Sequence, residues 1–435
     1  MQPKPSRGIG RRWGYEYQKK KIGDIATIID GDRGNNYPKQ NEFSPSGYFL
    51  FLNAGNVTAN GFVFDDNSYI TQEKDALLRK GRLSRGDIVY TTRGTIGNVA
   101  YYSNTIPYEH LRINSGMVIL RVNVVEANAA FLYQYLKSAK VREYFLSFKT
   151  GSAQPQLPIK NFSAIEIDLP DLPTQRRIAS ILSAYDDLIE NNRRQIKLLE
   201  EAAQRLYREW FVELRFPGHE GVKVVDGVPE GWKKVTIADS LAFHIGGGWG
   251  KETTNGKNTV AGKVIRGTDI NDIKNGDFGN IPLRYHTEND ILKRFLHPND
   301  IVFELSNGNI NNIGRCLMID NTLIKNLGCN TICASFCKLL RPHDEMISHL
   351  LYWEIQDMQN SGRMLPLKKH GSNGINNFDF DGFLKHEFLL PLERRLVQPL
   401  IYIMQKISNV QSQLVFLREA RDRLLSKLMS GETEA

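Results

Sequence analysis

The segment from Pro173 to Phe211 carries an unbroken heptad pattern of apolar side chains. Reading onward from Ile178 in alternating steps of four and three residues, every position is apolar except Asn192. The positions are Ile178, Leu182, Tyr185, Ile189, Asn192, Ile196, Leu199, Ala203, Leu206 and Trp210. At about 1.5 Å per residue such a helix is roughly 55 Å long, which exceeds an ordinary core helix. The segment therefore predicts a long helix with a coiled-coil seam.

The same pattern returns 218 positions later in the chain. Its positions are Leu396, Leu400, Ile403, Ile407, Val410, Leu414, Leu417, Arg421, Leu424 and Leu428. Residues around the seam agree as well, because Pro173, Arg176 and Arg177 recur as Pro391, Arg394 and Arg395. A repeat of this period is too long for a solenoid. It predicts a duplicated unit, in which a globular part and a long helix occur twice.

Two residues depart from the repeat. Pro399 stands inside the second seam, where the first copy has Ile181, so the second helix either begins near Gln398 or kinks at the proline. Arg421 occupies a seam position where the first copy has Ala203. A charge at this position costs stability unless it reaches solvent or finds a partner. It marks either the place where the helices separate or a contact with another subunit.

The 435 residues provide room for two domains of ordinary size in addition to the helices. No apolar run reaches membrane-spanning length, and no apolar segment follows the first basic residues, so we expect neither a membrane association nor a signal peptide. The N-terminal segment supplies most of the formal net charge of +8. Residues 1–18 are interpreted as a basic tail, either a solvated disordered end or a phosphate-binding arm.

The four cysteines, Cys316, Cys329, Cys333 and Cys337, form no C-x-x-C pair, and no histidine lies at zinc-finger spacing. We interpret them as buried apolar thiols in a reducing cytosol, with a metal site as the alternative.

Each globular half combines short strands, helices and polar loops. Arg82–Tyr102 and Phe295–Ile319 both read as a turn, an Asp, a β-branched strand, a polar loop and a second strand. We predict an α+β fold with two mixed α/β domains separated by two long helices that form an antiparallel coiled coil, related by an internal pseudo-two-fold repeat. The predicted boundaries are a first domain over 1–172, a spacer helix over 173–215, a second domain over 216–390 and a second spacer helix over 391–435.

The motifs of common nucleotide enzymes are missing. The chain has no G-x-x-x-x-G-K-[ST] loop for an ATP-driven motor and no Asn/Asp-Pro-Pro-aromatic motif of amino-methyltransferases. Asp272 and Lys274 form a D-x-K pair, which is a fragment of a nuclease signature, and a surface loop is the favoured alternative for them. Gly246–Gly248 is interpreted as a turn because the G-x-G-x-x-G spacing is absent. Tyr207, Trp210 and Phe211 at the end of the first helix form either an intramolecular cap or a docking patch.

Four features in order resemble the specificity (S) subunits of type I restriction-modification enzymes. They are GDIVYTTRGTIG in the first domain, LPDLPTQRRIASIL before the first long helix, PEGW at the start of the second domain, and LLSKLMSGE near the end. The resemblance covers about Lys19 to Glu432.

This resemblance implies that each globular part is a target recognition domain that reads half of a bipartite, asymmetric site in double-stranded DNA. It implies that the two helices pack antiparallel as a spacer and dock two methyltransferase (M) subunits, and that restriction/motor (R) subunits join them. It further implies no catalytic residue, metal or cofactor in this chain, since S-adenosylmethionine is bound by the methyltransferase and ATP and Mg²⁺ by the motor. A cytoplasmic prokaryotic location follows. A stand-alone nuclease and a non-enzymatic coiled-coil DNA-binding regulator remain alternatives.

Sequence-specific DNA binding requires side chains with fixed donors and acceptors, such as Arg for guanine and Asn or Gln for adenine. In the first half the candidates are Thr91, Thr92, Arg93, Thr95, Arg112, Lys149 and Gln154. In the second half they are Arg266, Asn307, Asn309, Asn311, Arg315, Lys368, Lys369 and Asn373. An exposed polar loop without a base contact is the alternative for each residue.

Overall fold

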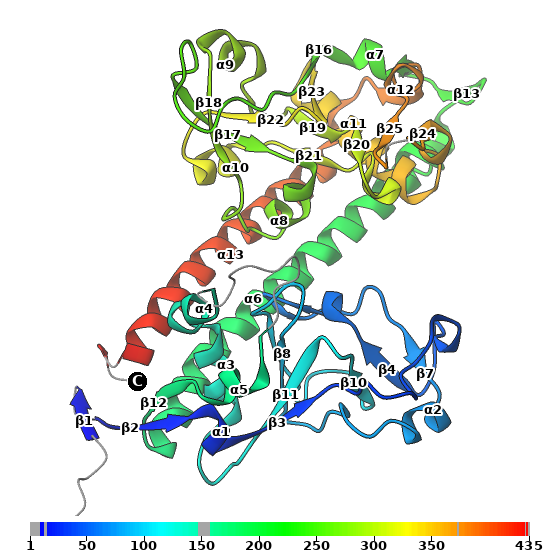
Figure 1. Cartoon of the computed structure of the whole chain (residues 1–435). Helices are drawn as coiled ribbons and strands as arrows, with labels where there is room; N and C mark the ends of the chain where they lie inside the picture. The colour runs from blue at the N-terminus through cyan, green and yellow to red at the C-terminus, as the bar shows by residue number, and fades with distance from the viewer. Residues whose placement is uncertain (1–8, 13–14, 147–156, 372–373, 431, 434–435) are drawn as a thin grey trace, which may run out of the picture. The chain divides into compact units, whose positions relative to one another are not determined.

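The computed structural model describes residues 9–12, 15–146, 157–371, 374–430 and 432–433. The chain divides into two compact units, of which unit 1 comprises residues 1–187 and 418–435 and unit 2 comprises residues 188–417. The long helices α6 (Leu172–Tyr207) and α13 (Gln398–Ser430) each contribute residues to both units (Figure 1).

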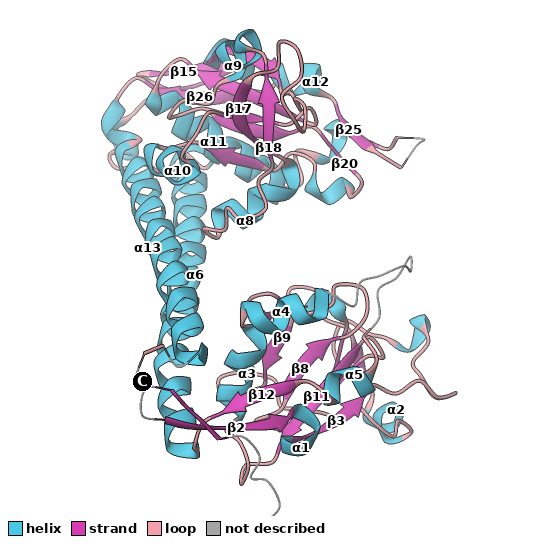
Figure 2. Ribbon diagram, turned by 60° about the vertical axis from the view of Figure 1, so that its left-hand side comes forward, coloured by secondary structure: helices cyan, strands magenta, loops and turns pink. Residues whose placement is uncertain are grey.

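A four-stranded antiparallel sheet forms the centre of unit 1 (Figure 2). Its strands, in spatial order, are β3 (Ala26–Asp30), β11 (Met117–Val122), β8 (Ile88–Thr91) and β9 (Val99–Tyr101). A second sheet pairs β10 (Leu111–Ile113) in parallel with β4 (Phe49–Leu52), and β4 antiparallel with β7 (Tyr69–Ile70). A third antiparallel sheet contains β1 (Ile9–Arg12), β2 (Tyr15–Lys21) and β12 (Glu166–Leu169), and a short hairpin joins β5 (Val57–Thr58) to β6 (Gly61–Phe62).

Four helices of unit 1 share an apolar core with the central sheet, namely α1 (Ile22–Ile25), α3 (Ala129–Lys137), α4 (Ala139–Leu146) and α5 (Ile159–Ser163). The helix α2 (Gln72–Ala76) lies beside the second sheet, next to β7 (Figure 1). The side chain of Asn128 caps α3 by accepting a hydrogen bond from the Phe131 amide at 3.0 Å. Phe131 and Tyr135 then join Ile178 and Leu182 of α6 in one apolar core, so the start of α6 is part of this unit.

Unit 2 repeats the strand order of the first two sheets and the pairing of β2 with β12. Its central antiparallel sheet has the order β16 (Leu241–Gly246), β23 (Cys337–Pro342), β19 (Ile301–Glu304) and β21 (Cys316–Met318). The second sheet pairs β22 (Thr331–Cys333) in parallel with β17 (Val260–Ile265), and β17 antiparallel with β18 (Leu283–His286). The pair of β15 (Trp232–Thr236) and β26 (Glu387–Pro391) corresponds to β2 and β12.

The helices of unit 2 follow the same order, with additions. They are α7 (Ile237–Ser240), α8 (Ile270–Lys274), α9 (Glu288–Arg294), α10 (Asn321–Leu327), α11 (Glu345–Asn360) and α12 (Phe380–Leu384). A hairpin joins β13 (Val224–Val225) to β14 (Val228–Pro229), and a small antiparallel sheet contains β20 (Ser306–Asn307), β25 (Asn376–Phe378) and β24 (Lys368–Lys369).

The duplication extends to individual contacts. Asp87, before β8, accepts hydrogen bonds from Arg121 on β11, and Asp300, before β19, accepts them from Arg341 on β23. Gly31 and Gly247 follow β3 and β16, and a Cβ at either would lie about 2 Å from a backbone carbonyl oxygen of the neighbouring turn. Both contacts require the same main-chain path in each unit, which confirms the predicted repeat.

The two predicted heptad seams face inward. All twenty positions are buried or partly buried, and none is exposed. Within unit 2, Ile189 and Ile196 of α6 pack with Ile407, Val410 and Leu414 of α13. Asn192, the polar seam residue, donates a hydrogen bond to Gln413 at 3.3 Å. Further along α6, Ala203 shares an apolar core with Leu400, near the start of α13, so the helices run antiparallel in this unit.

The structure decides between the alternatives that the sequence left open on the helices. The second helix begins at Gln398 and places Pro399 in its first turn, where a missing N–H costs no helical hydrogen bond. A π-helical turn over Arg208–Val212 continues α6. Tyr207 and Phe211 are buried in the core of unit 2, with Trp210 packed against it, so this group is an intramolecular cap.

Two expectations differ from the structure. The described residues of the basic N-terminal segment form β1 and β2 and are therefore not a disordered tail. The boundaries of the compact units fall inside the long helices, because the ends of α6 and α13 pack into the globular cores.

Candidate nucleic-acid interface

In unit 2 the polar loops leave the central sheet at one edge. Gly246 pairs with Lys338, Glu304 with Cys337, and Phe303 with Cys316, so the end of β16, the start of β23, the end of β19 and the start of β21 are neighbours. The segments 247–250, 305–315 and 334–336 therefore emerge together. In unit 1 the corresponding pairings bring together the segments 31–34, 92–98 and 114–116. In each unit these three segments lie together at one end of the central sheet, which is called the loop edge below.

The asparagines after β19 build a loop that supports itself. Asn307 donates to Glu304 at 2.7 Å and accepts a hydrogen bond from the Asn309 amide at 2.8 Å. Asn309 in turn accepts from the Asn311 amide at 3.0 Å. These bonds use the amide group of Asn307 internally, whereas Asn309 and Asn311 remain exposed. The exposed pair provides amide groups that match the donor–acceptor edge of adenine.

A second segment extends this loop into the small sheet of β20, β25 and β24 (Figure 1). Asn376 donates to the carbonyl oxygens of Asn307 and Gly308 at 3.3 and 2.9 Å, which fixes the two segments side by side. The candidates Lys368 and Lys369 lie on β24. Burial lowers the pKa of Lys368, and Lys369 is an exposed residue that pairs with Asp379 at 3.1 Å.

Arg266 and Arg315 are held by neighbouring carboxylates. Arg266 pairs with Asp269 at 2.6 Å, and its side-chain hydrogen bond to Asp269 raises the pKa of the guanidinium. Arg315 donates to Glu304 and to the Gly267 carbonyl, both at 2.9 Å, and is 17% exposed. These contacts stabilise the base of the loops. Both arginines therefore hold the loops in place.

In unit 1 the candidates of the loop after β8 divide by burial. Thr91 and Thr92 are buried, and their hydroxyl groups donate to the carbonyl oxygens of Thr95 and Gly116. Their role is to shape the loop, and Thr95 is exposed at its tip. Arg93 is partly exposed, and its Nε is enclosed without a hydrogen-bond partner. Arg93 is therefore the partly exposed cationic side chain of this loop, and Thr95 is its exposed hydroxyl group.

Arg112 has a different environment from the one expected of a DNA contact. It is 2% exposed on β10 and donates to the buried carboxylate of Asp75 and to the Lys80 carbonyl. Its guanidinium is thus enclosed by protein groups, which favours a structural role. The candidates Lys149, Gln154 and Asn373 lie outside the described residues.

Sequence reasoning missed three residues on these edges. Arg33 lies in the 31–34 segment and donates to Asp30 and to the Ser115 carbonyl. Trp249 lies in the 247–250 segment, where the guanidinium of Arg284 stacks over its ring at 4.9 Å. Phe336 lies in the 334–336 turn and is 58% exposed. Trp249 and Phe336 were missed because only polar side chains were considered as DNA contacts. An aromatic residue within a short polar turn is the sequence feature that could have indicated them.

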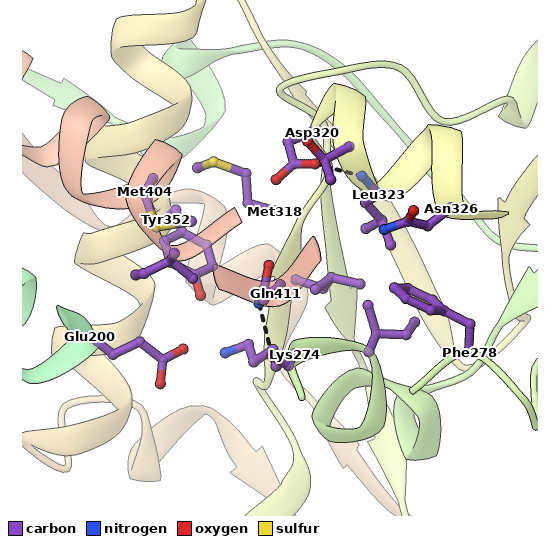
Figure 3. A pocket seen from close by; sticks show the side chains of 14 residues that line it. Glu200, Lys274, Phe278, Met318, Asp320, Leu323, Asn326, Tyr352, Met404 and Gln411 are labelled. Atoms are coloured by element: carbon purple, nitrogen blue, oxygen red, sulfur yellow. Dashed lines mark hydrogen bonds between the residues drawn. The ribbon is translucent and has the colours of Figure 1, made fainter. Parts of the chain in front are cut away.

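The D-x-K pair lies on the helix α8 and not in a loop. Asp272 is exposed, and Lys274 is partly exposed and lines a cavity of about 30 Å³ together with Glu200, Tyr352 and Gln411 (Figure 3). Gln411 donates to the Lys274 carbonyl at 2.9 Å. Burial opposes the charged form of Lys274, but Tyr352 and Glu200 outweigh it and raise the pKa of the amine above its ordinary value. Among the described residues, no cluster of His, Cys, Asp or Glu side chains that could hold a metal ion accompanies this pair.

The described part of the chain holds no group of three or more His, Cys, Asp or Glu side chains arranged for a metal ion. Cys316, Cys333 and Cys337 are buried, and Cys329 is partly buried. Burial raises the pKa of Cys316 to about 11 and that of Cys333 to about 12, so both thiols stay protonated. Among the described residues, no helix combines the length and apolar character needed to cross a bilayer.

Comparison with known proteins finds similarity to one class of protein. Residues 15–201 match the type I restriction modification DNA specificity domain. The chain is 27% identical over 362 residues to the type I restriction enzyme MjaIX specificity subunit of Methanocaldococcus jannaschii, an alignment that covers 80% of this chain and 78% of the relative. Over most of its length the chain is thus similar to type I restriction enzyme specificity subunits. A second relative is the HindI specificity subunit of Haemophilus influenzae, 27% identical over 42% of this chain and 40% of the relative.

The fold of the chain is shared with a solved specificity subunit. The crystal structure of the type I restriction-modification system S subunit from M. genitalium matches with a TM-score of 0.52 at 15% identity, over 97% of this chain and 98% of the other. The match extends through both units and both long helices.

Proposed function

We propose that this specificity subunit reads a bipartite, asymmetric site in double-stranded DNA, with the loop edge of unit 1 on one half-site and that of unit 2 on the other. The observation that carries the proposal is the repeated sheet edge with different side chains in the two units. The strand orders match, whereas Arg93 and Thr95 stand in one loop and Asn309 and Asn311 in the other. A shared scaffold with different loops suits the recognition of two different sequences.

We further propose that the chain carries no catalytic residue and acts by placing other subunits. Two methyltransferase subunits would bind S-adenosylmethionine, and motor-nuclease subunits would bind ATP and Mg²⁺ and cleave unmodified DNA. The long helices would serve as the spacer and as the docking surface, and the complex would work in the cytoplasm of a prokaryote. The similarity to specificity subunits argues against a stand-alone nuclease. A regulator without enzymatic partners would bind one site but direct no methylation.

The experiment compares the purified chain with the chain mixed with its methyltransferase partner. We expect the chain alone neither to methylate nor to cleave DNA, with or without Mg²⁺, and the mixture to methylate a single sequence. Methylation or cleavage by the isolated chain would contradict the proposal. A mixture that binds DNA but methylates no defined sequence would favour the regulator.

A further inference from the structure

Phe336 occupies the centre of the loop edge of unit 2. Its carbonyl oxygen accepts hydrogen bonds from the amides of Leu305 and Ser306, at 2.8 and 3.3 Å. These contacts hold the turn that carries Phe336 directly against the start of the asparagine loop. The side chain is 58% exposed even though its neighbours Ala334 and Cys337 are buried.

Unit 1 has the same main-chain arrangement without the side chain. There the carbonyl oxygen of Gly116 accepts hydrogen bonds from the amides of Thr92 and Arg93, at 2.9 and 3.2 Å. Gly116 lies directly before β11, as Phe336 lies directly before β23. The turn therefore needs no aromatic side chain for its geometry. The phenyl ring of Phe336 is an addition that belongs to unit 2 alone.

A single exposed apolar residue is common on protein surfaces, so its surroundings decide what it can do. Phe336 stands beside a loop whose exposed side chains include Asn309 and Asn311. Asparagine pairs with the major-groove edge of adenine, and the thymine opposite presents an apolar methyl group in the same groove. An amide and a phenyl ring presented by neighbouring loops of the same edge therefore match the two halves of an A·T pair, or of adjacent A·T pairs.

We propose that Phe336 is a specificity-determining residue that contacts the 5-methyl group of a thymine in the half-site read by unit 2. This inference rests on the proposed function, because it requires that the loop edge faces DNA. It adds a chemical class to that function, since the half-site of unit 2 must contain at least one A·T pair read from the major groove. Unit 1, with Gly116 at this position, would lack this contact.

The test uses the full chain in complex with its methyltransferase and the duplex that this complex selects from a random library. Each thymine of the selected duplex is replaced in turn by deoxyuridine, which removes only the methyl group. We expect one position in the half-site of unit 2 to weaken binding roughly fourfold, the effect of burying one methyl group. In Phe336→Ala this replacement should have no further effect, while Phe336→Leu should keep part of it.

Leu392→Ala is the matched control, since Leu392 is an exposed apolar residue of the same unit that follows β26. It should retain the full deoxyuridine effect. A Phe336→Ala complex that binds as tightly as the unaltered complex, or that still loses affinity on deoxyuridine replacement, would overturn the inference. So would a selected half-site of unit 2 without thymine on either strand. Failure to select any defined duplex would instead contradict the proposed function itself.

Discussion

Arg421 of α13 donates a hydrogen bond to Asp186 of α6 at 3.0 Å, although Arg421 occupies a heptad seam position. The same carboxylate accepts hydrogen bonds from Gln134 at 2.7 Å and from Lys137 at 3.0 Å on α3. A seam charge in unit 1 is thus compensated by a carboxylate that joins three helices. Burial alone would raise the pKa of Asp186, but Lys137, Gln134 and Arg421 together hold it below its usual value.

Replacing Asp186 with alanine should destabilise unit 1. The substitution leaves Lys137 largely buried without its carboxylate partner, whereas Arg421 keeps Asp422 at 2.7 Å. Breaking such a buried pair costs about 3–5 kcal/mol of the free energy of unfolding. Asp187→Ala removes a neighbouring exposed carboxylate from the same helix and should have little effect. Denaturant unfolding of the full chain measures both. Equal stability of the two variants would contradict the role assigned to Asp186.

The contribution of Asp186 should depend on pH with a definite sign. Because the folded-state pKa is depressed, the stabilisation is present above the unfolded value of about 3.9 and is lost as the pH falls through the folded pKa. The difference in unfolding free energy between the native chain and Asp186→Asn should therefore be largest near neutral pH and shrink below about pH 4. A difference that grows on acidification would contradict the depressed pKa.

Arg112→Ala should act on stability before it acts on DNA binding. The carboxylate of Asp75 is buried and pairs with Arg112. Removing the guanidinium leaves a buried charge with less compensation, at a cost of about 3–5 kcal/mol. Lys80→Ala, at an exposed neighbouring position, is the control. If Arg112→Ala unfolds at the same denaturant concentration as the native chain but loses DNA affinity, Arg112 is a DNA contact after all.

Tyr207→Phe should test how the end of α6 is held in unit 2. The Tyr207 hydroxyl donates to the buried carboxylate of Glu354 at 2.6 Å, and His386 and Arg363 contact the same carboxylate. A hydrogen bond to a charged group contributes about 1.5–3 kcal/mol. Tyr402→Phe removes an exposed hydroxyl group from α13 and should leave stability unchanged. Two variants with the same midpoint of unfolding would argue against this anchor.

The sequence predicted the helices better than the loops for a physical reason. A heptad pattern reports burial directly, and each predicted position from Ile178 to Leu428 is at least partly buried. The loops depend on contacts between residues far apart in the chain, such as Arg112 with Asp75. The alternation of inward and outward side chains along a strand also did not show which loop residues are exposed. All four residues of β8 are buried, and the Thr91 hydroxyl group is hydrogen-bonded to the Thr95 carbonyl oxygen. The sequence pattern also does not predict the strand order, and therefore it does not predict that the loops lie at one end of the sheet.

Arg93→Ala should weaken binding to the target sequence more than binding to random DNA. A lost bidentate contact to a base costs about 1–3 kcal/mol, whereas a lost phosphate contact weakens all sequences alike. Arg177→Ala removes an exposed arginine on α6 and serves as the control for net charge. Titration of the complex with both kinds of duplex at two salt concentrations separates the outcomes. Equal losses on target and random DNA would assign Arg93 to a phosphate.

An exchange of one unit tests whether each unit reads its own half-site. Residues 22–165 would be replaced by the corresponding residues of a related specificity subunit, which keeps the pairing of β2 with β12 and both long helices. The hybrid is produced with its methyltransferase, and sequencing of the methylated genome reports its site. We expect one half of the recognition sequence to change and the half assigned to unit 2 to stay the same. A simultaneous change of both halves would contradict the account, because it would require one composite reading surface.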